Sequence, residues 1–529
     1  MIFLAYPLFT LLLKSFFDGK SGDFSFAYFQ KFFSKQYYFN ALFNSIKVTI
    51  SVTLLSILIA GPLAYIMTTV KIKGGNFIKI LILISSMSAP FIGAYSWILL
   101  LGRNGVITNF VRDVFGFTMP DVYGFTGIVL VLTLQLSPLI FMFVSGALKN
   151  VDNSLMEAAE SMNCTGIRKM WKVLVPLITP TILAGGLLVF MRALADFGTP
   201  MLIGEGYKTI PVLIFTEFIS EVGGDDGFAA AISVLVVIFA TAVFLLQKYV
   251  SNRKSFTMSA LNPIEPKQKK GLSNIVLHGI VYLYTAIALM PQLYVMYTSF
   301  LKTSGRIFVK GYSFDSYRQA FSKIGDSIYN TFLLAGISII LIIVIAMLIA
   351  YVTVKRKSAL TNVLDVFTMF PYIVPGSILG IALLVSFNQK PMLFSGTMII
   401  MVVAFVIRRL PYTIRSSAAV LHQVNDSIEE ASISLGASTM RTFYKITLPM
   451  MISGVIAGAI ISWITIITEL STSIILYTGR TKTMTVAIYT EVIRGNYGVA
   501  AALSTILTII TVLSLLLFFK LSGKKEVTM

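Results

Sequence analysis

Apolar runs long enough to cross a bilayer recur from one end of this 529-residue chain to the other. Hydrophobic residues make up 56% of the chain and charged residues only 12%, a balance that soluble domains do not keep. The runs are continuous instead of alternating between apolar and polar residues, which favours helices over the strands of a transmembrane barrel. The sequence therefore predicts an all-α polytopic membrane protein.

We expect about twelve transmembrane helices in two sets of six. The first set lies near residues 1–17, 41–70, 77–101, 124–146, 173–196 and 228–250. The second set lies near residues 275–300, 329–354, 361–387, 393–411, 447–476 and 497–520. A polar, basic, proline-containing stretch separates the two sets and is typical of a linker. The expected organisation is thus a first unit at 1–250, a linker at 251–273 and a second unit at 274–529.

One polar pattern occurs in both halves. It runs from Glu157-Ala158-Ala159 to Pro176 in the first half and from Glu430-Ala431-Ser432 to Pro449 in the second, at a constant offset of 430 − 157 = 273. Weaker matches extend the repeat on both sides: Pro7 with Pro291, Asn44 with Asn330, Pro138 with Pro411, and Glu217 with Glu491. Because six spans return the chain to its starting side, we expect two parallel repeats related by an axis along the membrane normal.

Basic residues gather in loops that alternate onto one face of the expected bundle. This face carries both copies of the repeated pattern, the linker, Lys71 and Lys73, Lys355 to Lys357, and the basic residues near the C-terminus. By the positive-inside bias it is cytoplasmic, and both termini are expected on that side. The net charge of +19 then reflects membrane loops and anionic headgroups, not nucleic acid.

Each copy of the pattern predicts a short cytoplasmic helix, within residues 152–172 and 425–445. The candidate N-caps are Asp152, Ser154, Asp426 and Ser427. Gly436 is expected to end or bend the second helix, and its counterpart Asn163 is the next most tolerant residue for that backbone. The proline at the end of each copy is expected to restart a span. A polar helix between two spans needs a partner, and its repetition indicates that something docks twice.

The repeated pattern resembles the signature of the membrane permeases of binding-protein-dependent ABC importers. That signature reads Glu-Ala-Ala-x-x-x-Gly, a spacer, and then an apolar residue followed by Leu-Pro. The second copy matches it from Glu430 through Gly436 to Leu448-Pro449, whereas the first copy departs from it at Asn163 and Val175. By this resemblance the chain is identified as a fused, two-half permease with the type I ABC importer fold.

In that family the segment is the coupling helix, which sits in a cleft of a cytoplasmic ATPase. The resemblance implies two such ATPase subunits, an extracytoplasmic solute-binding protein and the bilayer of a prokaryotic cell membrane as partners. The coupling residues carried onto this sequence are Glu157, Ala158, Ala159, Asn163, Arg168, Glu430, Ala431, Ser432, Gly436 and Arg441. The sequence contains no Walker A motif. We therefore expect no enzyme activity, cofactor or metal in this chain, with ATP and Mg²⁺ used by the partner ATPases.

Two acidic residues lie at matching positions in the span that follows each copy. Asp196 and Glu469 repeat at the same offset, 469 − 196 = 273, and Arg192 precedes Asp196 by one helical turn, where the two can pair. Ionisable groups in a span normally face a partner or a watery cavity. Two interpretations stay open. Either these residues fix a break near the outer end of the span, or Arg192, Asp196 and Glu469 line the translocation path.

The run from Asp196 to Pro200, and its echo from Glu469 to Thr472, look like the fused permeases for ferric iron and their relatives. Ferric iron is the expected substrate, with phosphonate, hexose phosphate, thiamine or polyamine as alternatives for the same machinery. Carboxylates suit iron and Arg192 suits a phosphonate, so these residues do not decide. The alternative from another class is an ion-coupled secondary transporter, which more often shows broken helices with buried acids and hydroxyls.

Overall fold

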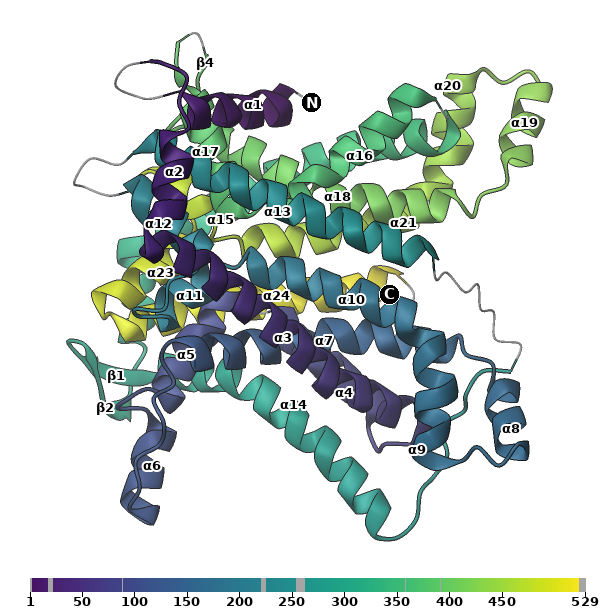
Figure 1. Ribbon diagram of the computed structural model, residues 1–529, viewed down its shortest axis with the longest axis horizontal. Helices are drawn as coiled ribbons and strands as arrows, with labels where there is room; N and C mark the ends of the chain where they lie inside the picture. The colour runs from purple at the N-terminus through teal and green to yellow at the C-terminus, as the bar shows by residue number, and fades with distance from the viewer. Residues whose placement is uncertain are drawn as a thin grey trace. The chain divides into compact units, whose positions relative to one another are not determined.

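The computed structural model describes residues 2–17, 22–87, 89–219, 225–253, 262–356, 358–390 and 392–522 (Figure 1). Helices dominate this part of the chain. Its named strands form two short hairpins, β1 (Leu301–Ser304) with β2 (Ile307–Tyr312) and β3 (Asn388–Gln389) with β4 (Met392–Leu393). The predicted all-α class is confirmed. Of the expected linker, residues 254–261 lie outside the described residues.

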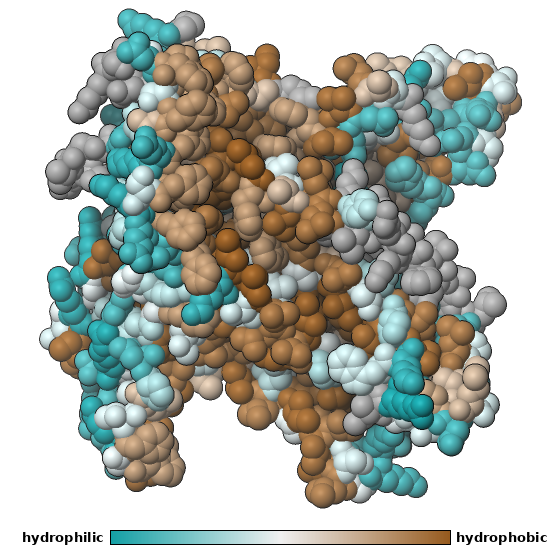
Figure 2. Space-filling model, in the orientation of Figure 1, coloured by the Kyte–Doolittle hydropathy of each residue, from teal (hydrophilic) through white to brown (hydrophobic). Residues whose placement is uncertain are grey.

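Eight helical stretches in the described residues are long and apolar enough to cross a membrane. They are α3 (Gln36–Thr69), α7 (Phe125–Lys149), Met170–Leu194, α13 (Asp226–Arg253), α14 (Leu272–Ser299), α15 (Asp315–Lys355), Thr439–Ile467 and α24 (Tyr497–Ser522). Figure 2 shows hydrophobic residues along the flanks of such helices, whereas polar residues gather around α19 (Asp426–Ser434) and α20 (Thr439–Thr442). This distribution matches lipid around the spans and water around the helix ends.

Two expected spans are bent. The expected 77–101 is α4 (Gly75–Met87) followed by α5 (Pro90–Leu101) and α6 (Val106–Phe115), with a bend of 98° after α4. The expected 361–387 is α16 (Ala359–Ile373) followed by α17 (Gly376–Ser386), with a bend of 107°. Pro90 and Pro375 stand at these breaks, where the ring removes a backbone donor and disfavours helix in the residue before it. Val374 is accordingly extended, at φ −76° and ψ 124°.

Counting each bent pair as one span gives ten candidates among the described residues, not twelve. Helix α1 (Ile2–Phe16) has only 15 residues. Helix α18 (Met398–Leu421) replaces the expected span 393–411 and contains Arg408, Arg409 and Arg415, which are too many charges for an ordinary apolar span. The difference from the sequence-based count thus comes from one short helix and one charged helix.

The chain forms two compact units that do not follow its two sequence halves. One unit contains α1 and α2 (Ala27–Ser34) together with α15–α24, and the other contains α3–α11 together with α14 as far as Val295; α12 (Ile210–Ile219) and α13 are divided between them. In the first unit, the rings of Phe3 and Tyr6 lie 5.5 and 5.8 Å from that of Phe387, at the end of α17. In the second, Tyr284 of α14 shares a 2.7 Å hydrogen bond with Ser137 of α7. Each repeat therefore contributes its first helix to the unit that holds the rest of the other repeat.

Candidate functional site

The two copies of the repeated pattern begin with similarly capped helices. In the first copy, α8 (Asn153–Ser161) follows Asp152, whose side chain accepts the backbone N–H of Ser154 at 2.9 Å. This N-cap was predicted. In the second copy the cap is Asn425, whose side chain accepts the backbone N–H of Ser427 at 3.1 Å. The prediction of Asp426 as the cap was wrong, because the extended residue that precedes the helix is Asn425 and Asp426 is already helical.

Both short helices end at a left-handed residue, as predicted. Asn163 has φ 58° and Gly436 has φ 88°. The next N–H in each copy reaches back five residues, from Cys164 to the carbonyl of Ala159 at 2.9 Å and from Ala437 to that of Ser432 at 3.1 Å. This Schellman arrangement satisfies carbonyls that the helix end leaves without donors. The substitution of Asn for Gly in the first copy therefore preserves the backbone turn.

The chain then re-enters a helix that runs through the proline of each copy. The first copy continues as α9 (Gly166–Lys169), a π turn η1 (Met170–Leu174) and α10 (Val175–Leu194). The second continues as α20, a π turn η2 (Phe443–Thr447) and α21 (Leu448–Ile467). We expected Pro176 and Pro449 to restart the spans; each does stand in the first turn of α10 or α21, but the π turn joins that helix to the one before it. The helix starts earlier, and a wider turn before each proline accommodates a residue that has no N–H.

Three pairs of equivalent positions expose large apolar side chains on these segments. Leu155 and Ile428 are 44% and 39% exposed, Met162 and Leu435 are 82% and 89% exposed, and Trp171 and Tyr444 are 68% and 60% exposed. The members of each pair have the same numerical offset as the pattern itself. Apolar groups repeated at the edge of polar helices are typical of a surface that a partner covers.

Different side chains hold the two helices in place. In the first copy Met156 and Leu174 are buried at equivalent positions to Glu429 and Thr447 of the second. Thr447 donates a 2.6 Å hydrogen bond to Glu429. Lys355, at the end of α15, pairs with Asp426 and lies 3.9 Å from Glu429. The first helix is thus anchored mainly by apolar packing and the second by polar contacts.

Further contacts brace the first copy from outside the helix. The ion pair between Lys169 and Glu160 holds the pKa of Glu160 below its usual value. The described part of the linker also touches this copy, because the backbone N–H of Asn153 donates to the carbonyl of Asn262 at 2.7 Å. The first repeated helix is therefore tied to the linker, and the second is tied to α15.

Most of the predicted coupling residues lie on the exposed side of these segments. Ala159 and Ser432 are buried, and Ser432 shares a 2.9 Å hydrogen bond with Thr442. Glu157 is exposed and accepts a 2.6 Å hydrogen bond from Asn153. The remaining predicted residues are also exposed: Ala158, Asn163, Arg168, Glu430, Ala431, Gly436 and Arg441. A partner approaching these segments would meet two acidic and two basic side chains around the apolar ones.

The acids at matching depth mark a break in each long helix. Helix α10 ends at Leu194, and Asp196 accepts the backbone N–H of Thr199 at 2.9 Å at the start of α11 (Gly198–Ile203). Helix α21 ends at Ile467, and Glu469 accepts the backbone N–H of Thr472 at 3.1 Å before α22 (Ser473–Leu476). Both carboxylates therefore act on the backbone three residues further on, where a helix has stopped.

Two arginines that the sequence analysis missed pair with Glu469. Arg408 Nε lies 3.1 Å from Glu469 Oε2, and Arg409 Nη2 donates to the same oxygen. All three side chains are largely buried, with 13%, 13% and 3% of their area exposed. The equivalents of the arginines in the first repeat are Gln135 and Leu136. A sequence signal existed, since two adjacent arginines are unusual inside a span.

The arginine cluster lies where two helix breaks meet in one unit. Thr472 donates a 3.1 Å hydrogen bond to the carbonyl of Gly376, the first residue of α17. A Cβ at Gly376 would overlap Arg408 Nη1, so a larger residue there would have to displace the guanidinium. With two guanidinium groups and one carboxylate, this junction carries a net charge of +1, which makes it suited to an anionic group.

No group of three or more His, Cys, Asp or Glu side chains that could hold a metal ion occurs in the part of the chain that the structure describes. Asp196 and Glu469, the acids considered as iron ligands, already accept backbone hydrogen bonds. Both carboxylates thus serve helix breaks, and Glu469 also pairs with two arginines.

Comparison with known proteins gives a consistent assignment. The family model described as binding-protein-dependent transport system inner membrane component matches residues 2–256 and 342–524, and so includes both repeated segments. The chain is 28% identical to the ferric transport system permease protein FbpB of Actinobacillus pleuropneumoniae, over 98% of this chain and 76% of that protein.

Two further relatives are similar to this chain over different shares of its length. A putative ferric transport system permease protein FbpB 1 of Haemophilus influenzae is 28% identical over 91% of this chain and 76% of that protein. A putative 2-aminoethylphosphonate transport system permease protein PhnU of Salmonella typhimurium is 22% identical over 47% of this chain and 87% of that protein. The match does not support the alternative of an ion-coupled secondary transporter. The chain belongs to the family of binding-protein-dependent transport system inner membrane components and is a multi-pass permease of the ABC importer class.

Proposed function

We propose that two cytoplasmic ATPase subunits dock onto this permease, one on each repeated segment, and that they hydrolyse the ATP that drives import. The observation that carries this proposal is the set of three exposed apolar pairs, Leu155 with Ile428, Met162 with Leu435 and Trp171 with Tyr444, at equivalent positions of the two repeated segments. A binding protein delivers cargo at the opposite face. Both termini of the chain lie in the cytoplasm of a prokaryotic cell, and ATP and Mg²⁺ bind to the partner subunits.

Continuous helices connect the docking segments to the breaks. From Gly166 to Leu194 the chain is helical without interruption and ends beside Asp196; from Thr439 to Ile467 it is helical and ends beside Glu469. Closure of the ATPases would therefore move the break at the far end of each continuous helix. Any bending of that helix would occur at its π turn. We assign Arg192, Asp196 and Glu469 to the translocation path on this basis.

Removal of the apolar contacts tests the docking. Met162→Glu with Leu435→Glu places charges where a covered apolar surface is expected, and the ATPase subunits should no longer co-purify with the permease. Each single variant should retain one docking site. The matched control is Ile307→Glu in β2, a residue that is 69% exposed and lies outside both segments. Co-purification that survives the double variant, with the protein folded, contradicts the proposal.

The proposed cargo is ferric iron. Support comes from two ferric permeases that are 28% identical to this chain over nearly all of its length. Because Asp196 and Glu469 already accept backbone hydrogen bonds, iron would cross without firm ligation by these carboxylates. The direct test is ATP-dependent uptake of radioactive iron by cells with and without the permease; no difference between them rules out iron.

A second candidate cargo is an organic anion such as a phosphonate. The net positive junction of Arg408, Arg409 and Glu469 favours it, and the phosphonate permease matched one half of the chain. Arg409→Gln removes the excess charge and should abolish phosphonate uptake while largely sparing iron uptake. The control Arg415→Gln lies on the same helix, where Arg415 is 52% exposed and paired with Asp365. Equal loss of uptake in both variants contradicts an anionic cargo recognised at the junction.

A further inference from the structure

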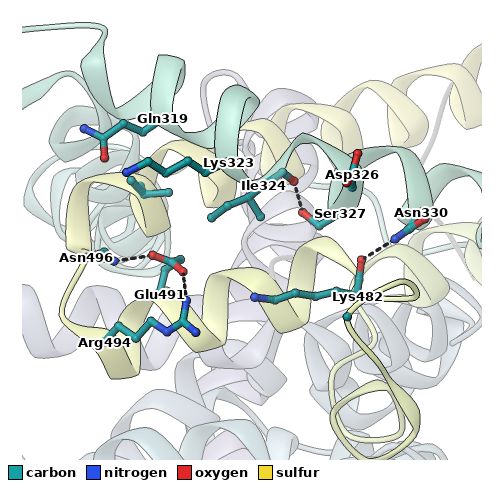
Figure 3. Close-up of a pocket in the computed structure, with 12 residues that line it drawn as sticks. Gln319, Lys323, Ile324, Asp326, Ser327, Asn330, Lys482, Glu491, Arg494 and Asn496 are labelled. Atoms are coloured by element: carbon teal, nitrogen blue, oxygen red, sulfur yellow. Dashed lines mark hydrogen bonds and ion pairs between the residues drawn. The ribbon is translucent and has the colours of Figure 1, made fainter. Parts of the chain in front are cut away.

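A pocket of about 380 Å³ lies within the unit that contains α15 (Figure 3). Its walls come from the N-terminal part of α15, the loop before α23 (Met484–Arg494), α23 itself and the start of α24. Lys323 stands near the start of α15, and Lys355, which touches the second repeated segment, stands at its end. At the rise of an α-helix the two lie about 50 Å apart, which is more than the thickness of a bilayer core. The pocket therefore lies at the end of α15 opposite the second repeated segment, which is extracytoplasmic if the proposed function holds.

Two acidic residues line this pocket, the exposed Asp326 and the buried Glu491, and Glu491 is already satisfied. Glu491 is 5% exposed, and its carboxylate receives a 3.2 Å hydrogen bond from Arg494 and a 2.6 Å hydrogen bond from Asn496. Figure 3 shows this group on one side of the pocket. Asp326 lies above α15 in the same view, whereas Lys482 enters from below. Arg494 and Glu491 thus neutralise one another.

Two lysines remain. Among the described residues, neither Lys323 nor Lys482 forms an ion pair with a carboxylate. Lys482 is half-buried, and burial lowers its pKa, with the neighbouring charge of Arg494 adding to this effect and Glu491 opposing it. In Figure 3 its ammonium group extends toward Glu491 and Arg494, while Lys323 approaches from α15. With three basic and two acidic side chains, the lining of the pocket therefore carries a net charge of +1.

The first repeat has an equivalent lysine, held by the same hydrogen bond to its backbone carbonyl, but the side chain of that lysine contacts an aromatic ring. Asn44 donates to the carbonyl of Lys208 at 3.1 Å, as Asn330 donates to that of Lys482 at 3.2 Å. The Lys208 ammonium, however, lies 5.3 Å from the centre of the Tyr37 ring. Position 37 corresponds to Lys323, since 330 − 44 = 323 − 37 = 286. The second repeat has replaced an aromatic partner for the lysine with a second lysine.

We propose that this pocket binds a small organic anion through its carboxylate or phosphate groups, held by Lys482 and Lys323. Ammonium groups form short, charge-assisted hydrogen bonds to such oxygens. The volume falls in the range of small-molecule sites and exceeds the needs of a halide ion. Asn496 and Gln319 supply further polar groups at the wall. None of the residues that line it belongs to a helix break or to a docking segment.

The test is anion binding to the purified full chain in lipid nanodiscs, measured by thermal shift and calorimetry. Citrate and inorganic phosphate are the two probes, and sodium chloride at matched ionic strength controls for screening. At least one probe should bind saturably. Lys482→Gln should weaken its binding by about tenfold or more, since each charged hydrogen bond contributes on that scale. Lys323→Tyr, which recreates the arrangement of the first repeat, should do the same.

Two matched controls remove the same charge elsewhere. Lys208→Gln alters the equivalent lysine of the first repeat, and Lys310→Gln alters an exposed lysine of β2; both should bind the probe as the unaltered chain does. The proposal fails if neither probe binds beyond the chloride control, or if binding survives Lys482→Gln and Lys323→Tyr. Because the readout needs no ATPase, its failure is distinguishable from failure of the proposed docking.

Discussion

At the broken end of each long helix, the two repeats place an acid in the same backbone position but surround it differently. Asp196 and Glu469 each accept the N–H of the residue three positions on. Glu469 also forms ion pairs with two buried arginines of α18, whereas the residues at the corresponding positions of α7 are Gln135 and Leu136. The shared part of the arrangement concerns helix termination. The two arginines, which occur only in the second repeat, change the charge around the acid. The two repeats therefore share the helix break but differ in its electrostatics.

The docking segments show the same division. Caps and left-handed residues coincide at Asp152 and Asn425 and at Asn163 and Gly436. The anchors do not, because Met156 of the first copy is replaced by Glu429 in the second. Since the exposed apolar groups are equivalent, the outer surfaces match while the supporting contacts differ. We therefore expect similar docking of two partners on supports of unequal strength.

The largest difference should appear when the two acids are neutralised. Glu469→Gln leaves two buried guanidinium groups without a carboxylate, which costs about 3–5 kcal/mol of stability. Asp196→Asn keeps an oxygen that can accept the N–H of Thr199 and should cost about 1 kcal/mol or less. Thermal unfolding of the purified variants in one detergent measures both. Equal losses of stability in the two variants would show that Arg408 and Arg409 do not need the charge of Glu469 to remain buried.

A smaller difference in stability should appear when the side chains that hold the two short helices in place, Met156 and Glu429, are truncated. Met156→Ala opens a cavity beside η1 and should destabilise the first segment by about 2–4 kcal/mol. Glu429→Ala removes a hydrogen bond from Thr447, but Lys355 keeps Asp426, so the loss should be about 1–2 kcal/mol. Hydrogen exchange of α8 and α19 measures each segment separately. Faster exchange in α19 of Glu429→Ala than in α8 of Met156→Ala would reverse the comparison.

The smallest effects belong to the left-handed positions. Exchanging the residues, as Asn163→Gly and Gly436→Asn, should change stability by about 1 kcal/mol or less, because both residues tolerate φ above zero. Gly436→Val should cost more than Gly436→Asn, since a branched side chain is strained there. The readout is again exchange of α19. If Asn and Val behave alike at 436, the left-handed turn is not retained in the variants.

The features predicted from sequence are those that depend on a few neighbouring residues. The left-handed residues at 163 and 436 and the Asp152 cap follow from local backbone preference. The cap at Asn425 was missed because two adjacent residues, Asn425 and Asp426, both make good caps. Pro90 and Pro375 were read inside continuous spans, although proline disfavours such continuity.

Features that depend on tertiary structure were beyond the sequence pattern. The role of Arg408 and Arg409 appears only when α18 lies against the end of α21, because their partner Glu469 is distant in the chain. The placement of α1 beside α17 and of α14 beside α7 likewise depends on packing between distant helices. Hydrophobic runs in the sequence indicate that such helices exist but not which other helices they pack against.

The most direct test of docking on both segments is thiol protection in inside-out membrane vesicles. With Cys164, the chain's single cysteine, replaced by Ser, one new cysteine is introduced at Met162, Leu435 or, as a control, Ile307. Reaction with a water-soluble maleimide is compared before and after urea strips the peripheral ATPases. The account predicts slow reaction at 162 and 435 that becomes fast on stripping, with no change for 307. Equal reactivity at 162 and 435 before and after stripping would contradict it.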